Sequence, residues 1–258
     1  MEFIQFEQSN HIARIRFNKP GKYNSFHRAM ALEVQEALRQ CHEDPEVRVV
    51  LITGEGKAFC AGQDLQELTG DNPPGFHTIL SEHFNPIIQL IRDIEKPVVA
   101  AVNGVAAGAG ANIALACDFV VAKNSASFIQ AFSKIGLVPD SGGTFFLPRL
   151  IGLPRATALM MLGDRIEAAA AVQIGMIYKA FPDDQFVQGV EDLLAQLAAM
   201  PTRALGLTKR ALNHSLLNDL GAQLSIEEEL QIQAGQTEDY REGVQAFLEK
   251  RLPVFKGA

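Results

Sequence analysis

Residues 96–112 read Lys96-Pro-Val-Val-Ala-Ala-Val-Asn-Gly-Val-Ala-Ala-Gly-Ala-Gly-Ala-Asn112 and are the most informative segment of the chain. The apolar run Val98 to Val102 predicts a buried strand, which Asn103-Gly104 ends. The small residues Ala106 to Ala111 predict the start of a helix. The first N–H groups of a helix lack internal partners and lie at the positive end of its dipole. Two interpretations are open: a site for an oxyanion, or close packing of the helix on the strand.

The regions on either side of this segment alternate between strands and helices, which predicts an α/β fold of stacked βα units. The expected elements are strands at 3–8 and 12–17 (a hairpin), a helix at 28–41, a strand at 47–53, a helix at 76–92 that Pro86 kinks or restarts, and a strand at 119–122.

From Thr144 onward the pattern is mainly helical. Helices are expected at 144–150, 154–162, 168–174, 184–200, 203–217, 226–234 and 240–250, with a short strand at 177–181. We place a domain boundary near Met200-Pro201, which gives a core of residues 1–200 and a helical region of residues 201–258. The Leu and Ile content of the second region exceeds what a lone helix pair covers. It is therefore expected to pack on the core or on another subunit.

The composition limits the classes of partner. The chain has 258 residues, is 47% hydrophobic and carries a net charge of −7, so it can bury a sizeable core and is not expected to bind nucleic acid. No apolar run has transmembrane length and no signal peptide is recognisable, which predicts a cytoplasmic protein with no membrane partner. Cys41, Cys60 and Cys117 suit reduced, buried thiols, and the histidine and cysteine spacings predict no metal site.

A second informative segment reads Ala58-Phe-Cys-Ala-Gly-Gln-Asp-Leu65. Ala61 and Gly62 allow close backbone approach, and Gln63 can present its N–H at the start of a short helix that Asp64 caps. Taken alone, this segment is a capped turn. Paired with the segment at Ala109 it gains a function, because an oxyanion hole needs two donors that converge.

The third segment reads Gly136-Leu-Val-Pro-Asp-Ser-Gly-Gly-Thr144. Asp140 is either the N-cap of the helix at 144–150 or an acid/base held by a rigid turn. Asp-Ser-Gly-Gly also resembles the nucleophile turn of chymotrypsin-like proteases. We exclude that interpretation because those proteases are secreted, disulfide-bonded, all-β proteins.

Together these segments resemble the crotonase (enoyl-CoA hydratase/isomerase) superfamily over nearly the full length. The resemblance implies a spiral of ββα units, a helical C-terminal region used in trimerisation, and an acyl-CoA thioester substrate. It implies no separate cofactor, because coenzyme A is part of the substrate, and a homotrimer or a hexamer made of two trimers. The matching motifs are Asn18-Lys-Pro with Asn24, residues 58–65, Pro97 to Gly104, Cys117-Asp118, Gly142-Gly-Thr144, and Phe247-Leu-Glu-Lys-Arg251 with Pro253 and Phe255-Lys256.

The resemblance also assigns roles by position. The oxyanion donors are the backbone N–H groups of Gln63 and Ala109. Phe255 and Lys256 fall near the coenzyme A nucleotide, either that of their own subunit or that of a neighbouring one. The remaining positions expected to bind substrate are Ala61, Gly62, Asp64, Leu65, Gly108, Asn112 and Phe132.

Departures from the family pattern narrow the chemistry. Hydratases place a catalytic glutamate in the helix after the oxyanion glycines, where this chain has Asn112, and a second one where it has Phe132. Adding water needs one group that activates water and another that delivers a proton, so efficient hydration is not expected. Asp140 is the remaining acid. Residues 131–144 most resemble the ring 1,2-epoxyphenylacetyl-CoA isomerases of phenylacetate breakdown.

One carboxylate suffices for a proton shift next to a thioester, so the sequence predicts an acyl-CoA isomerase with Asp140 as acid/base. Three alternatives are open. A Δ3,Δ2-enoyl-CoA isomerase, or another general member of the family, would use the same apparatus. A dehalogenase-like enzyme would use Asp140 as a nucleophile. A CoA-binding or assembly subunit would have no chemistry of its own.

Overall fold

The chain folds around two β-sheets. The structure is a computed structural model and describes residues 1–69 and 73–258. The larger sheet has the strand order β1-β2-β3-β5-β7-β10 and is parallel except for the β1–β2 hairpin. Its strands are β1 Ile4–Ser9, β2 Ile12–Phe17, β3 Val49–Gly54, β5 Val98–Val102, β7 Phe119–Lys123 and β10 Lys179–Phe181.

The smaller sheet has the order β4-β6-β8-β9, with strands β4 Ala58–Cys60, β6 Val105–Ala107, β8 Ser127–Ile129 and β9 Arg165–Glu167. Successive units contribute one strand to each sheet: β3 and β4, then β5 and β6, then β7 and β8. The sequence pattern did not predict the smaller sheet. The helix expected from Ala106 is wrong at its start, because residues 105–107 pair with β4 and β8 and the helix begins at Ala109.

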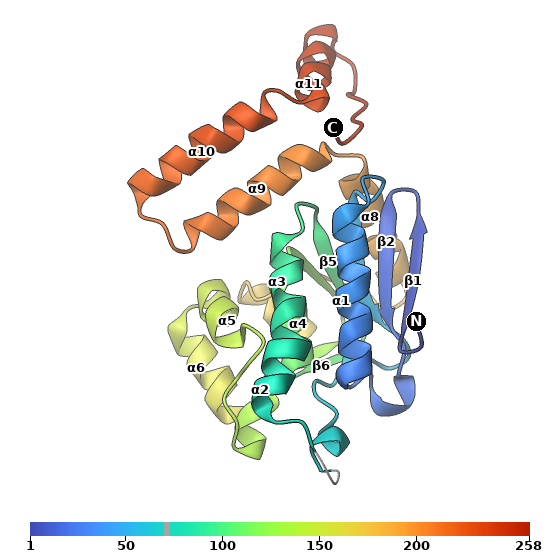
Figure 1. The fold of residues 1–258 in the computed structure, drawn as a ribbon, viewed down its shortest axis with the longest axis vertical. Helices are drawn as coiled ribbons and strands as arrows, with labels where there is room; N and C mark the ends of the chain where they lie inside the picture. Colours follow the sequence, from blue (N-terminus) through green and yellow to red (C-terminus); the bar gives the residue numbers. More distant parts are fainter. Residues whose placement is uncertain (70–72) are drawn as a thin grey trace.

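The helices surround these sheets (Figure 1). They are α1 Arg28–Glu43, α2 Phe76–Thr78, α3 Asn85–Asp93, α4 Ala109–Ala116, α5 Gly143–Ile151, α6 Leu153–Leu162, α7 Ala168–Gln173, α8 Phe186–Ala198, α9 Thr202–Ser215, α10 Leu220–Ala234 and α11 Glu238–Glu249, with short helices η1 Pro20–Lys22, η2 Leu65–Leu68, the π-helix η3 Ile79–Phe84, and η4 Ala131–Ile135. The helix expected at 76–92 is present as the consecutive segments α2, η3 and α3. Phe84 and Asn85 keep helical backbone angles, so the expectation that Pro86 restarts a helix is wrong: it lies at the second position of α3, directly after the π-helix.

Burial explains why the central segments fold as they do. All the residues of β3 and β5 are buried, as expected of strands covered on both faces. Helix α4 is buried along its whole length, and its small side chains let it lie against β4: a Cβ at Gly110 would lie 2.4 Å from the Cys60 carbonyl oxygen. The interpretation of close packing is therefore correct for Gly110. The three cysteine thiols are free and buried.

The C-terminal helices extend away from the sheets (Figure 1), with α9 and α10 side by side and α11 beyond them. The Arg48 guanidinium joins this region to the core through the Thr202 hydroxyl (3.1 Å) and the Phe255 carbonyl oxygen (3.0 Å). Several large apolar side chains of α10, α11 and the tail are exposed: Leu220, Leu224, Ile232, Val244, Phe247, Leu248, Leu252 and Val254. The division into residues 1–200 and 201–258 stays a prediction. None of the helices within the described ranges is long and apolar enough to cross a membrane.

Candidate active site

The segments around Gly62 and Ala109 lie against one another. Gly62 has φ +88°, and a Cβ built on it would lie 3.0 Å from the Ala107 carbonyl oxygen and 3.4 Å from the Ala109 nitrogen. Only glycine adopts this conformation readily and tolerates that approach. Gly62 also donates its N–H to the Cys60 sulfur (3.3 Å). The two backbone segments predicted to form an oxyanion site are therefore adjacent.

Both predicted donor groups are available. Phe26 pairs with the residues on either side of Gln63: its N–H bonds the Gly62 carbonyl oxygen (2.8 Å), and its carbonyl oxygen accepts the Asp64 N–H (2.7 Å). Within residues 1–69 and 73–258, the N–H groups of Gln63 and Ala109 have no acceptor. Ala109 is the first residue of α4, where an N–H is unpaired and favoured for binding an anion.

The Phe132 ring borders this site. Gly108 precedes α4 with φ +54° and ψ −127°, and a Cβ on it would lie 3.8 Å from the tip of the Phe132 ring. Phe132 is buried, with 6% of its surface exposed. Phe132 therefore places an apolar ring beside the first turn of α4.

Asp140 lies in the turn before α5. Its side chain caps no helix, since α5 begins at Gly143 and has Gly142 at its N-cap, so the interpretation of Asp140 as the N-cap is wrong. One carboxylate oxygen accepts a hydrogen bond from the Ser141 hydroxyl at 2.8 Å. Burial raises the pKa of Asp140, and the Ser141 hydrogen bond opposes that shift. Asp140 is partly buried, and a carboxyl whose pKa burial raises is suited to act as a base near neutral pH.

The Asn112 side chain connects α4 to this turn. Its amide nitrogen donates to the Asp140 carbonyl oxygen at 2.8 Å, and its amide oxygen accepts from the Gln130 amide at 2.7 Å. Asn112 is fully buried. A Cβ at Gly143 would lie 2.4 Å from the Asn112 amide nitrogen, so only glycine at 143 leaves room for this contact. Asn112 lies one helical turn after Ala109, and one hydrogen bond therefore links the helix that carries a free N–H to the turn that carries the acid.

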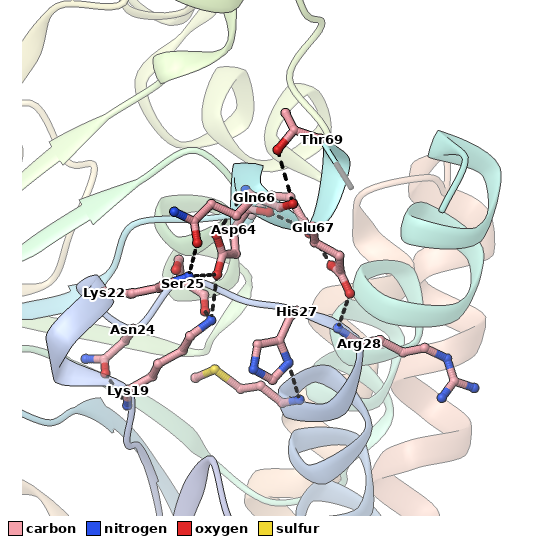
Figure 2. Close-up of polar contacts among 12 residues, drawn as sticks. Lys19, Lys22, Asn24, Ser25, His27, Arg28, Asp64, Gln66, Glu67 and Thr69 are labelled. Carbon is pink, nitrogen blue, oxygen red and sulfur yellow. Dashed lines mark hydrogen bonds and ion pairs between the residues drawn. The ribbon is translucent and has the colours of Figure 1, made fainter. Parts of the chain in front are cut away.

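Asp64 lies between two lysines (Figure 2). Its carboxylate accepts hydrogen bonds from the Lys19 ammonium (2.8 Å), the Lys22 ammonium (3.1 Å) and the Gln66 N–H (3.1 Å), the last of which caps η2 as expected. Burial alone would raise the pKa of Asp64, but these hydrogen bonds outweigh it and lower the pKa to about 2. Asp64 therefore fixes the turn next to Gln63 as an ionised carboxylate.

Glu67 supports the same turn from the other side. It accepts a hydrogen bond from the Gln63 side-chain amide (2.6 Å) with one oxygen and from the Arg28 N–H (2.9 Å) with the other. Figure 2 shows the bond to Arg28, at the first turn of α1. The Gln63 side chain is thereby tied to the N-terminus of a long helix, which limits rotation of the peptide that carries its free N–H.

Other predicted residues lie around or away from this site. Ala61 donates its N–H to the Tyr23 carbonyl oxygen (2.9 Å), and Leu65 is half exposed at the start of η2. The backbone N–H of Lys256 bonds Asp239 in α11 (2.7 Å), and a Cβ on Gly243 of α11 would lie 3.5 Å from the Phe255 ring. Figure 1 shows this tail beside α11, on the opposite side of the molecule from η2. The structure does not bring Phe255 and Lys256 to the site of their own chain.

Comparison with known proteins agrees with this geometry. The sequence profile of the enoyl-CoA hydratase/isomerase family matches residues 7–258. The chain belongs to the enoyl-CoA hydratase/isomerase family. This family is the crotonase superfamily, so the predicted α/β fold is confirmed, as is the prediction of an enzyme.

Individual relatives cover all or nearly all of the chain. The 1,2-epoxyphenylacetyl-CoA isomerase of Escherichia coli (strain K12) is 43% identical over 260 residues, which cover 100% of this chain and 99% of that one. A "Probable enoyl-CoA hydratase" of Rhodobacter capsulatus is 44% identical over 254 residues, 98% of each chain. The crystal structure of an enoyl-CoA hydratase from Bacillus anthracis superimposes with a TM-score of 0.93 at 34% identity and covers 100% of both chains.

The structure also reveals supporting residues that the sequence pattern did not. Gln130, Glu67 and Ser141 hold the side chains of Asn112, Gln63 and Asp140. Gln130 carries no sequence signal, because it reaches Asn112 from 18 residues further along the chain. Glu67 had one, since it lies four residues after Gln63 and can meet its side chain in a helical turn. Ser141 had a signal, since a hydroxyl next to an acid in a glycine-rich turn can bond it. Across the described ranges, no three His, Cys, Asp or Glu side chains form a cluster that could hold a metal ion.

Proposed function

We propose that the protein is an acyl-CoA isomerase in which Asp140 moves a proton and the N–H groups of Gln63 and Ala109 bind the thioester oxygen. The observation that supports this most is the pair of free N–H groups on adjacent segments, together with a partly buried acid, Asp140, whose pKa is raised. The acid and the helix that carries one of these donors are joined through Asn112.

The reaction follows from these parts. The Asp140 carboxylate removes a proton from the carbon next to the thioester carbonyl, and the electron pair moves onto the carbonyl oxygen. The two N–H groups stabilise this enolate, and each such donor lowers the barrier by about 3 kcal/mol. Asp140 then returns the proton to a conjugated carbon. The electron pair returns from the oxygen, and the double bond has moved.

Hydration is disfavoured by the same contacts. Asn112 bears no acidic proton, and its amide already bonds Asp140 and Gln130. Phe132 has no group that could activate water. Asp140 would have to perform both proton transfers of a hydration alone, whereas an isomerisation needs only one group that takes and returns a proton.

The physiological substrate we propose is 1,2-epoxyphenylacetyl-CoA. Proton loss from its side-chain carbon would drive opening of the three-membered ring and expansion to the seven-membered oxepin. Two findings support this choice: the relative of that name at 43% identity, and the apolar Phe132 ring beside the site, which suits an aromatic acyl group. The alternative substrate is a 3-enoyl-CoA. It is supported by 34% identity to the trans-2-decenoyl-[acyl-carrier-protein] isomerase of Streptococcus mutans.

We further propose a homotrimer, or a hexamer of two trimers, in which Phe255 and Lys256 reach the coenzyme A nucleotide of a neighbouring subunit. The exposed apolar side chains of α10, α11 and the tail support this, as does the distance of the tail from η2 in its own chain (Figure 1).

The cytoplasm is the proposed compartment, supported by three free thiols. Asp64, Leu65 and the other predicted substrate contacts keep their proposed roles.

The experiment is incubation of the purified protein with 1,2-epoxyphenylacetyl-CoA and, separately, with a 3-enoyl-CoA in deuterated water. We expect an oxepin product from the first and a 2-enoyl-CoA from the second, each with deuterium at the exchangeable carbon. A 3-hydroxyacyl-CoA product from a 2-enoyl-CoA at a comparable rate would instead show a hydratase.

The same preparation tests for a dehalogenase-like enzyme and for a CoA-binding subunit without chemistry. A dehalogenase-like enzyme uses Asp140 as a nucleophile: its carboxylate attacks the halogen-bearing carbon of a halogenated aryl-CoA, the carbon–halogen bond breaks and halide leaves, and mass spectrometry detects the aryl ester on Asp140. A CoA-binding subunit would turn over neither substrate, and its cellular function would survive Asp140→Asn. The proposal requires no adduct, turnover by the wild-type protein, and its loss in Asp140→Asn.

A further inference from the structure

Ser141 has an unusual backbone conformation for a buried residue with a side chain. Its φ is +51°, in the left-handed region, and only 2% of its surface is exposed. Glycine or asparagine is the usual residue there, because the Cβ of other residues meets the neighbouring carbonyl oxygen. The next residue, Gly142, also has a positive φ (+73°). A serine in this conformation persists only when its contacts hold it there, and the contact of its hydroxyl is one of these.

The Ser141 hydroxyl has one partner, and that partner is the proposed acid. Its Oγ donates to Oδ1 of Asp140 at 2.8 Å. The main chain of Asp140 is fixed separately, since its carbonyl oxygen accepts both the Asn112 amide (2.8 Å) and the Gly143 N–H (2.9 Å). Rotation of the carboxyl about its side-chain bonds is therefore the freedom that remains, and the hydroxyl bond removes it.

We infer that Ser141 is a positioning residue for Asp140: its hydroxyl holds one carboxylate oxygen and leaves the other free to take the proton of the substrate. This inference rests on the proposed function. In the described part of the chain, no other side chain bonds the Asp140 carboxylate. The left-handed backbone conformation of Ser141 and this contact occur in the same turn.

The hydrogen bond also sets when Asp140 is ionised. A hydroxyl that donates to a carboxylate stabilises its charged form, so it lowers the pKa against the effect of burial. No charged group of the described residues pairs with Asp140, and burial and Ser141 are the two causes of its shift. Removing the hydroxyl should therefore raise the pKa of Asp140 further. The ionised base would then appear only at higher pH.

The experiment compares Ser141→Ala and Ser141→Gly with the wild type and with Ser225→Ala. Ser225 is exposed and donates its hydroxyl to a backbone carbonyl in α10. Ser141→Gly also relieves the strain, so its melting temperature should not fall. We expect the pKa seen on the acid side of the pH profile of kcat/KM to rise by about one pH unit in both Ser141 variants. At pH values below that pKa, kcat/KM should fall tenfold, and it should recover at higher pH. An equal loss at every pH, or no change, would overturn the inference.

A second measurement does not depend on turnover. Carbon-13 NMR titration of the aspartate carboxyls, with Asp140→Asn to assign the signal, gives the pKa of Asp140 in the ligand-free protein. An upward shift in both Ser141 variants supports the inference, and an unchanged pKa overturns it. Absence of isomerisation by the wild-type protein would contradict the proposed function alone, and the titration would still test the role of Ser141.

Discussion

The side-chain amide of Asn112 donates a 2.8 Å hydrogen bond to the main-chain oxygen of Asp140. By the family resemblance, Asn112 is expected at the position at which hydratases carry a catalytic glutamate. Here the side chain at that position holds the turn that presents a different acid. The substitution therefore does more than remove a carboxylate, because it gives the chain a fixed location for the one that remains.

Asn112→Ala should lower kcat more than it raises KM. It removes the support of the Asp140 turn and leaves the buried Gln130 amide without its acceptor (2.7 Å in the wild type). An unpaired buried group of this kind costs about 1–3 kcal/mol. Urea unfolding and steady-state kinetics measure the two effects, with the exposed Asn124→Ala as control. Wild-type kcat in Asn112→Ala would contradict the role we assign to this contact.

Gly143→Ala should resemble Asn112→Ala. The added methyl group would lie 2.4 Å from the Asn112 amide nitrogen, so one of the two residues has to move and the bond to Asp140 is lost. We expect a loss in kcat of the same order in both variants, and little further loss when they are combined. Gly21→Ala is a matched control, because a Cβ there meets nothing within 4 Å. Additive losses in the double variant would show that Gly143 acts through something other than Asn112.

Gly62→Ala should damage the oxyanion site. A methyl group there would lie 3.0 Å from the Ala107 carbonyl oxygen, at a φ of +88°, and would push the Gln63 and Ala109 segments apart. Loss of one oxyanion donor costs on the order of 10²–10³ in kcat. Gly175→Ala has the same kind of backbone strain (φ +77°), with its nearest neighbour 3.8 Å away, and should keep its activity. Similar kcat values in the two variants would refute the assignment of these donors.

Asp64 should make the free energy of unfolding fall as the pH is lowered into the acid range. Its pKa is lowered to about 2 in the folded protein, against about 3.9 in an unfolded chain. A lowered carboxyl pKa stabilises the fold above the unfolded value, and that contribution is lost as the pH falls from about 4 to about 2. We expect Asp64→Asn to cost about 2 kcal/mol of unfolding free energy at pH 7 and little at pH 2. Guanidinium unfolding at both pH values, with the exposed Asp164→Asn as control, measures this difference.

Much of this architecture could be predicted from the sequence, because long elements have strong periodic patterns. The β1–β2 hairpin, α1, β5, α9 and α11 lie where their patterns indicated, within two residues, whereas α10 begins six residues earlier than the helix expected at 226–234. The smaller sheet could not be predicted. Its three-residue strands, such as Val105–Ala107, are too short to show alternation, and they form because β4 and β8 lie beside them.

Some features of the candidate site could likewise be predicted from the sequence, and others could not. Gly62, Gly108 and Gly110 could be found because close backbone approach restricts the residue type. The partner of Asn112 could not be found, because the Asp140 carbonyl oxygen lies 28 residues further along the chain. The choice between an N-cap and a free acid for Asp140 also needed the structure. It depends on which residue begins α5.

The central claim is that Asp140 removes a proton from the carbon next to a thioester. The most direct measurement is exchange of that proton for deuterium in phenylacetyl-CoA, which has the acidic carbon but no double bond to move. We predict exchange by the wild-type protein, and none by Asp140→Asn with phenylacetyl-CoA bound at unchanged affinity. The variant should remain folded, since it removes a partly buried charge that burial disfavours, and this does not destabilise the protein at neutral pH. Exchange at the wild-type rate in Asp140→Asn would contradict the account.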